Sequence, residues 1–502
     1  MVMMRGFSYS VIALAFLGCG DDGGTVKSDA AVDAPNDAPA DAAPLTLGAP
    51  PDLAMACADT PANVYTLPSG LPAMNDTHRG DVIRCATTES LSAFKVNAQI
   101  DGYNTGYTNT VAGHATSGFW TFRIAYRSTR NTVGTTRAEG DTAAFLLVPE
   151  KPLAGAPLIV FGHGSTGFAA KCAPSHLDLS GAVKDEDYPP MLYRLAGAGY
   201  TVIAPDYHGF SYGQAPGYFN AEDEAHAILD ATRAAAKILK TPPPKVAFVG
   251  HSQGAHAVIS AQTYAESYGM TGTLVGVATL APFWTSLTLF PAATTATAGL
   301  TTANDVNSIL YAMAYAYSAS ELREGTGHGL DVFATAKQAA AKDALLGDNC
   351  YDSAKLQALG ATPADFFDTN YVNIVGSSCA VGGSCNDPLA VKWKARFPED
   401  RPALDPTGAP VLAMFGGADT TITVGRASCM HDKFAAELAA GGTTTTIQYC
   451  YNSTAAHRDP VRTADADYLI SWIAAKAGIA AAPAACTDFP AAIICPGVPQ
   501  NY

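Results

Sequence analysis

The sequence predicts an α/β fold, with a mostly parallel central sheet, helices on both faces of it and a long helical insertion before the last strands. Two observations lead to this prediction. From about residue 119 to residue 475, short apolar β-type segments alternate with segments of helical pattern. One such strand, residues 246–249, runs directly into Gly250-His251-Ser252-Gln253-Gly254 and then into a helix-like segment. With 502 residues, 48% of them hydrophobic and only 15% charged, the chain can bury one large core.

Four further strands and two helices are expected before this serine. The strands are predicted at residues 121–126, 143–149, 157–161 and 200–206, the first two as an antiparallel opening pair. The helices are predicted at residues 191–198 and 221–240. Asn220 can cap the second helix, whose acidic start and basic end suit the helix dipole.

The segment around Ser252 has the pattern of a nucleophile elbow, a sharp strand-to-helix turn that lifts one serine clear of the sheet. Such a turn is strained and brings strand and helix close together, so the positions two before and two after the serine must be very small. Gly250 and Gly254 meet that requirement. The motif in this context predicts an α/β-hydrolase fold with Ser252 as nucleophile.

A serine nucleophile needs a base and an acid that orients the base, and this fold places them in the order Ser, Asp or Glu, then His. A predicted strand at residues 410–415 ends in a tight turn that presents Asp419. The last predicted strand, residues 445–451, is followed by a short polar loop and then His457. We therefore predict His457 as the base and Asp419 as its orienting carboxylate.

Other histidines and aspartates fit non-catalytic positions better. His431 precedes the last strand and is typical of a surface helix. Asp432 and Asp465 have the pattern of solvated helix positions, and Asp405 that of a turn. His251 and His256 flank the serine in sequence but are expected to point elsewhere.

The oxyanion formed during catalysis should bind two backbone N–H groups. One belongs to the residue after the nucleophile, Gln253, and the other to a loop after an earlier strand. We expect Ser165 in the Gly-rich segment 162–167 to supply the second, with Thr166 as the alternative. A plain Gly-rich turn is the competing interpretation. The Gly spacing also resembles a phosphate-binding loop, but no Gly-Lys-Ser/Thr follows and the segment does not open a helix as Gly-x-Gly-x-x-Gly does, which argues against nucleotide binding.

Residues 283–409 separate two predicted core strands, and these 127 residues are too many for a loop in a compact domain. Apolar residues with helical spacing, and an alanine-rich segment at residues 331–345, predict helices there. The apolar residues are Val306, Ile309, Leu310, Met313 and Tyr317. An insertion at this edge of the sheet is expected to form a cap above Ser252 that shapes an acyl pocket.

Several motifs together resemble those of the secreted lipase family that includes yeast lipase A and bacterial secretory lipases. They are Gly162-His163-Gly164-Ser165-Thr166-Gly167, Cys172-Ala173-Pro174-Ser175, Asp206-Tyr207-x-Gly209, the acidic helix starting at Ala221, and Gly250-His251-Ser252-Gln253-Gly254. The resemblance covers roughly residues 119–475. It implies an α/β-hydrolase fold with a helical cap, carboxylic ester substrates, and Ser252, Asp419 and His457 as the triad.

The N-terminal region has the pattern of an exported protein. Arg5 precedes an apolar run of eleven residues, 7–17, which is too short to span a bilayer but suits a signal peptide. The following Gly18-Cys19 resembles a lipoprotein processing site, so Cys19 is a candidate for lipidation, which would anchor the enzyme to an envelope membrane. Cleavage by an ordinary signal peptidase is the alternative.

The resulting domain prediction has five parts. They are a signal peptide at 1–18, a disordered Asp/Ala/Pro linker at 19–56, a hydrolase core at 57–282 and 410–475, a cap at 283–409, and a disulfide-closed tail at 476–502.

The chain has eleven cysteines, and ten remain if Cys19 is lipidated, an even number that suits an oxidising compartment. The expected pairs are Cys57–Cys85, Cys172–Cys350, Cys379–Cys385, Cys429–Cys450 and Cys486–Cys495, although spacing alone does not fix connectivity. Neither a metal nor a cofactor is expected, because Cys379 and Cys385 lack a second pair or suitable histidines.

The formal net charge is −15, and eight Asp with one Lys in residues 20–60 contribute −7 of it. Nearly half of the net negative charge therefore lies in this N-terminal region, and the lack of a basic stripe argues against nucleic-acid binding. The sequence predicts an exported serine hydrolase that cleaves small-molecule or lipid esters and contacts a membrane only through its N-terminal anchor. A serine peptidase on the same fold and a non-catalytic envelope binding protein are the alternatives.

Overall fold

The computed structural model describes residues 47–130, 138–284, 294, 303–347, 350, 353–376, 387–440 and 444–495. Three expectations lie outside these residues: the signal peptide, lipidation at Cys19, and the pair Cys379–Cys385. Most of the expected linker also lies outside them.

The core of the molecule is one nine-stranded sheet with the order β1-β2-β3-β5-β4-β6-β7-β8-β9. Its strands are β1 (Val82–Leu91), β2 (Phe119–Arg130), β3 (Ala138–Pro149), β4 (Leu158–Gly162), β5 (Val202–Pro205), β6 (Lys245–His251), β7 (Thr273–Leu280), β8 (Val411–Gly416) and β9 (Ile447–Asn452). In this order, the pairings β1–β2, β2–β3 and β3–β5 are antiparallel. The remaining pairings, from β5–β4 through to β8–β9, are parallel. The predicted mostly parallel sheet is confirmed.

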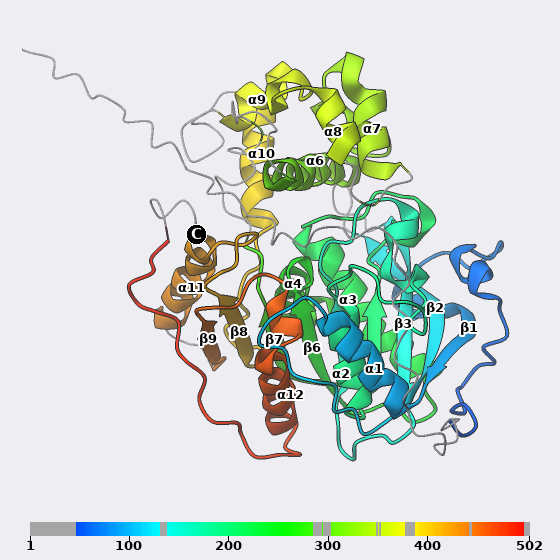
Figure 1. Ribbon diagram of the computed structural model, residues 1–502. Helices are drawn as coiled ribbons and strands as arrows, with labels where there is room; N and C mark the ends of the chain where they lie inside the picture. Colours follow the sequence, from blue (N-terminus) through cyan, green and yellow to red (C-terminus); the bar gives the residue numbers. More distant parts are fainter. Residues whose placement is uncertain are drawn as a thin grey trace, which may run out of the picture.

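Helices cover both faces of the sheet (Figure 1). On one face lie α3 (Ala221–Ile238), α4 (Gln253–Tyr268) and α11 (Val424–Ala439), and on the other α1 (Ala93–Asn104), α2 (Pro189–Gly197) and α12 (Ala464–Lys476). The sequence of β6 is apolar at successive positions because both faces of this strand are buried. Val246 and Phe248 belong to the apolar layer on one face, and Ala247 and Val249 to the layer on the other.

Two local predictions were wrong. The sheet begins at β1 rather than near residue 119, because β1 is an edge strand whose polar residues, such as Arg84 and Glu89, obscure its pattern. The helix expected at 331–345 begins only at Gln338, as α7 (Gln338–Leu346). Before it the chain is extended at Phe333, which forms an isolated β-bridge with Phe367.

The described part of the long insertion between β7 and β8 is mainly helical, as predicted. Its helices are α6 (Ala303–Glu324), α7, α8 (Ser353–Leu359), α9 (Thr369–Gly376) and α10 (Pro388–Glu399), and they gather beyond one edge of the sheet (Figure 1). These helices share an apolar cluster of their own, in which Leu310, Met313 and Tyr315 are buried.

Four disulfides join the described cysteines. Cys57–Cys85 and Cys172–Cys350 are as expected. The expected pairs Cys429–Cys450 and Cys486–Cys495 were wrong: the structure has Cys429–Cys495 and Cys450–Cys486. The reason is that the tail does not close on itself but runs along the edge of β9, where the N–H of Tyr451 donates to the carbonyl of Thr487 at 2.8 Å.

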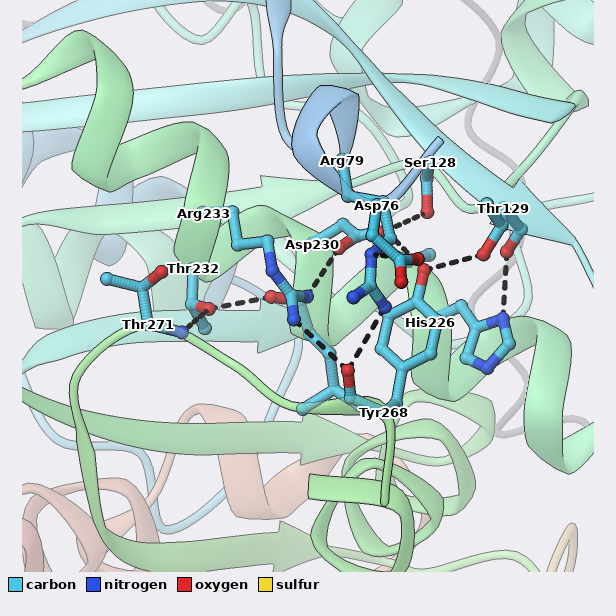
Figure 2. A network of polar contacts seen from close by, with 12 residues as sticks. Asp76, Arg79, Ser128, Thr129, His226, Asp230, Thr232, Arg233, Tyr268 and Thr271 are labelled. Carbon is cyan, nitrogen blue, oxygen red and sulfur yellow. Dashed lines mark hydrogen bonds and ion pairs between the residues drawn. The ribbon is translucent and has the colours of Figure 1, made fainter. Parts of the chain in front are cut away.

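A buried polar network ties α3 and the end of α4 to strand β2 (Figure 2). Asp230 is fully buried and accepts hydrogen bonds from Ser128 Oγ at 2.5 Å and from the Tyr268 hydroxyl at 2.6 Å. Arg233 donates to its other oxygen at 2.6 Å, and the His226 ring stacks on Tyr268 at 3.7 Å. All polar groups that meet Asp230 are satisfied, so this network fixes where the two helices lie against the sheet.

Candidate active site

Ser252 occupies a strained turn between β6 and α4, with φ 56° and ψ −117°. A Cβ at Gly250 would overlap the carbonyl oxygen of Gly254, and a Cβ at Gly254 would overlap that of Gly162. The close approach of strand and helix thus requires both glycines.

The structure brings the three residues predicted for catalysis together. His457 Nε2 lies 3.0 Å from Ser252 Oγ, and His457 Nδ1 lies 2.8 Å from Asp419 Oδ2. Asp419 follows β8 and His457 follows β9, so both emerge at the same edge of the sheet as Ser252. A hydroxyl, an imidazole and a carboxylate in this order can move a proton from the serine to the histidine.

The Asp419 carboxylate is fixed by its own loop. Its second oxygen, Oδ1, accepts the N–H groups of Thr421 at 2.9 Å and of Ile422 at 2.7 Å. Burial acts to lower the pKa of His457, but the charge and hydrogen bond of Asp419, together with the charge of Asp187, outweigh burial and raise that pKa above its ordinary value.

Gln253 is the first residue of α4, so its backbone N–H has no acceptor within the helix. The loop after β4 passes close to the serine: a Cβ built on Gly164 would lie 3.3 Å from Ser252 Cβ. The next residue, Ser165, donates from Oγ to Gln253 Oε1 at 3.3 Å. Gln253 and Ser165 therefore lie side by side next to Ser252, where a second amide for an oxyanion would be needed.

His251 takes a position that the sequence did not suggest. Its Nε2 lies 2.9 Å from the backbone carbonyl of His457 and must carry the proton of that hydrogen bond. Burial lowers the pKa of His251 to about 4, so the ring is neutral. It braces the loop that carries His457, over a separation of 206 residues that leaves no local signal in the sequence.

A cavity of about 460 Å³ opens over Ser252 and His457. One of its walls carries aromatic rings, and Phe219 and Phe283 are stacked there with centroids 3.9 Å apart. Another wall is the acidic segment 185–187. A substrate over Ser252 would thus meet an apolar surface and a charged one.

Arg458, beside His457, holds that acidic segment in place. It forms an ion pair with Asp187 at 2.8 Å and a second ion pair with Asp185. Burial and repulsion from the carboxylates of Asp187 and Asp185 together raise the pKa of Glu186 to about 7. None of these acids was singled out from the sequence, because only the fold brings them to His457.

Among the residues that the structure describes, no three His, Cys, Asp or Glu side chains form a group suited to a metal ion. Within the same ranges, no helix has both the length and the apolar character needed to cross a bilayer.

The chain is similar to known proteins over part of its sequence and in its fold. The model of the secretory lipase family matches residues 177–357, and the resemblance drawn from the sequence motifs is thereby confirmed. Lipase A of Moesziomyces aphidis is 32% identical over 162 residues. That match spans 31% of this chain and 33% of the relative, so the chain matches only about a third of that curated relative's length.

Solved structures show the same fold. Candida antarctica lipase A in its closed state has a TM-score of 0.60 at 19% identity, over 89% of this chain and 94% of that one. A putative hydrolase of Legionella pneumophila gives 0.56 at 16% identity, over 79% and 98%. The rice cell wall degrading esterase LipA of Xanthomonas oryzae gives 0.54 at 17% identity, over 80% and 97%. The predicted α/β-hydrolase fold is confirmed.

Proposed function

We propose that this α/β-hydrolase cleaves carboxylic esters with Ser252 as nucleophile, His457 as general base and acid, and Asp419 as the residue that orients His457. The observation that carries the proposal is the hydrogen-bonded chain from Ser252 Oγ to His457 and from His457 to Asp419, at 3.0 and 2.8 Å. The match to the secretory lipase family favours esters as the substrates.

In the proposed reaction, His457 Nε2 takes the proton of Ser252 as Oγ attacks the ester carbonyl. Asp419 keeps the other imidazole proton on Nδ1 and stabilises the imidazolium. The N–H groups of Gln253 and Ser165 stabilise the tetrahedral oxyanion. His457 then protonates the departing alkoxide, and water attacks the acyl-enzyme by the same route to release the acid.

Hydrolysis of p-nitrophenyl esters from acetate to palmitate tests this function, with the Ser252→Ala variant as the blank. We expect the wild type to hydrolyse esters and the variant to fall to the blank without loss of fold. A maximum at long chains would identify a lipase, and one at two to four carbons an esterase. Cleavage of amides but not of esters would favour a peptidase instead, and a folded chain without any activity a binding protein.

The disulfides and the family match indicate an exported protein. We further propose that residues 1–18 are a signal peptide and that Cys19 carries a lipid anchor. Mass spectrometry of the mature N-terminus after expression in a bacterium tests this. A diacylglyceryl mass on Cys19, absent in Cys19→Ser, is expected, and an unmodified mature N-terminus would refute the anchor.

The insertion at 283–409 is proposed to act as the cap over this site, since its residues Phe283 and Tyr311 both line the cavity. The tail at 476–502 is proposed to brace the edge of the sheet through its disulfides to Cys450 and Cys429.

A further inference from the structure

Glu224 on α3 is a carboxylate that the proposed reaction does not use, although it lies fully buried next to the nucleophile elbow. Its Oε1 accepts the side-chain Nε2–H of Gln253 at 2.8 Å and the backbone N–H of Phe219 at 3.0 Å. Its Oε2 lies 2.7 Å from His256 Nδ1. A buried carboxylate is costly to form even when three hydrogen bonds hold it, as they do here, so a function for Glu224 is worth seeking.

The proton count of the Glu224–His256 pair follows from the acceptor on the far side of the ring. His256 Nε2 lies 2.7 Å from the backbone carbonyl of Asp400, which can only accept, so Nε2 carries a proton. The 2.7 Å contact of Nδ1 with Glu224 then needs one more proton between the two groups. Whichever group holds it, the pair is neutral as a whole, as full burial demands. In agreement, burial raises the pKa of Glu224.

This pair sets the side chain of the residue that follows the nucleophile. Because Gln253 donates to Glu224, its amide oxygen faces the other way and accepts from Ser165 Oγ at 3.3 Å. Ser165 Oγ also contacts the Tyr218 hydroxyl at 2.7 Å. One continuous chain of hydrogen bonds thus runs from Glu224 through Gln253 to Ser165. Gln253 and Ser165 are the two residues whose backbone N–H groups are proposed to bind the oxyanion.

The pair is also fixed from the side of the cap. The Asp400 carboxylate accepts from the Tyr315 hydroxyl at 2.8 Å and from both terminal nitrogens of Arg323 at 2.8 and 2.6 Å. Tyr315 and Arg323 belong to α6, so helices α3, α4 and α6 meet at this one point.

We propose that Glu224 and His256 are positioning residues that share one proton and fix the separation of the Gln253 and Ser165 amides through the Gln253 side chain. This inference rests on the proposed function. Without the pair, the Gln253 side chain can rotate, and the loop that carries Ser165 loses the hydrogen bond from Ser165 Oγ to Gln253 Oε1. Misplacement of one oxyanion donor weakens stabilisation of the transition state more than binding of the substrate, so kcat is affected and KM is not.

Variants at position 224 test the proposal with p-nitrophenyl butyrate. Glu224→Leu should lower kcat by about 10- to 100-fold and leave KM within about threefold, since removal of a whole oxyanion donor costs about 10²–10³. Glu224→Gln should keep kcat within about threefold of the wild type, because its oxygen still accepts from Gln253 and its NH₂ can donate to neutral His256. Glu224→Asp, which is one methylene shorter, should lie between them and covers the case that Glu224→Leu does not fold.

The matched control is Asp230→Leu, which removes another fully buried carboxylate from the same helix, in the network of Figure 2. Asp230 bonds to Tyr268 at the opposite end of α4 from Ser252, so this variant should lose stability but keep its kcat per folded molecule. Active-site titration with a fluorophosphonate counts the folded molecules in each preparation.

The outcomes separate the two proposals. Loss of kcat in Glu224→Leu and Glu224→Asp, with recovery in Glu224→Gln and none of it in Asp230→Leu, supports the positioning role. Equal kcat in all of these variants, or the same loss in Asp230→Leu, overturns it. Absence of esterase activity in the wild type, or its persistence in Ser252→Ala, refutes the proposed function itself.

Discussion

Replacement of Asp419 by asparagine is expected to lower kcat for ester hydrolysis by about 10⁴-fold. The reason lies in the contacts of Asp419. Its Oδ1 accepts two backbone N–H groups, from Thr421 and Ile422, so the oxygen of the new amide must stay there. The NH₂ group then faces His457 Nδ1 and turns that nitrogen into an acceptor. The imidazole proton moves to Nε2, which faces Ser252 Oγ at 3.0 Å and can no longer take its proton.

A 10⁴-fold loss corresponds to about 5 kcal/mol of transition-state stabilisation, at about 1.36 kcal/mol for each factor of ten. The assay is steady-state hydrolysis of p-nitrophenyl butyrate across pH 5–9, with urea denaturation to establish that the variant is folded. Asp419, with a smaller contribution from Asp187, raises the pKa of His457 against the effect of burial. The acid limb of the kcat/KM profile should therefore move to lower pH in the variant.

Asp432→Asn is the control, because Asp432 contacts His431 on α11 at 3.0 Å in a His–Asp pair outside the site. It should leave kcat unchanged. A folded Asp419→Asn variant with kcat within about tenfold of the wild type would refute the tautomer argument, as would an acid limb that stays in place.

Three further predictions concern the elbow, the cap and pH. In Gly254→Ala the new methyl group overlaps the carbonyl oxygen of Gly162. The unfolding free energy should therefore fall by about 3 kcal/mol or more, and activity should be lost. A stable, active variant would contradict the geometry of the elbow. Removal of the disulfide in Cys172→Ser/Cys350→Ser should lower the unfolding free energy by about 2–5 kcal/mol in urea, since it closes a long loop; an unchanged midpoint would argue against this bond. Burial lowers the pKa of His163 to about 4, so the stability that its neutral ring supplies is complete above pH 6.5 and is lost as the pH falls towards 4. The difference in unfolding free energy between wild type and His163→Asn should shrink by up to about 3 kcal/mol over that window, and a constant difference would refute this sign.

The parts of this protein that could be predicted from sequence are those with a local signal. The elbow needs Gly250 and Gly254 within five residues of each other, and the strand before it is apolar because both faces are buried. The chain order of the fold and the end of each strand then led to Asp419 and His457, which the structure places in contact with each other.

What could not be predicted depends on contacts between distant segments. The tail disulfides follow from where the tail runs along β9, and spacing in the sequence carries no such information. Likewise, Glu224 has the pattern of an acidic first turn that favours the helix dipole, and only packing of α3 on α4 turns it towards His256. Strand β1 was missed because polar residues such as Arg84 and Glu89 interrupt its apolar pattern.

Mass-spectrometric mapping of a fluorophosphonate label tests the central claim most directly. The account predicts one label per molecule, on the peptide that contains Ser252, and none in Ser252→Ala or in protein unfolded in urea. A folded wild type that stays unlabelled, or a label on another residue, would contradict the account of Ser252 as the nucleophile.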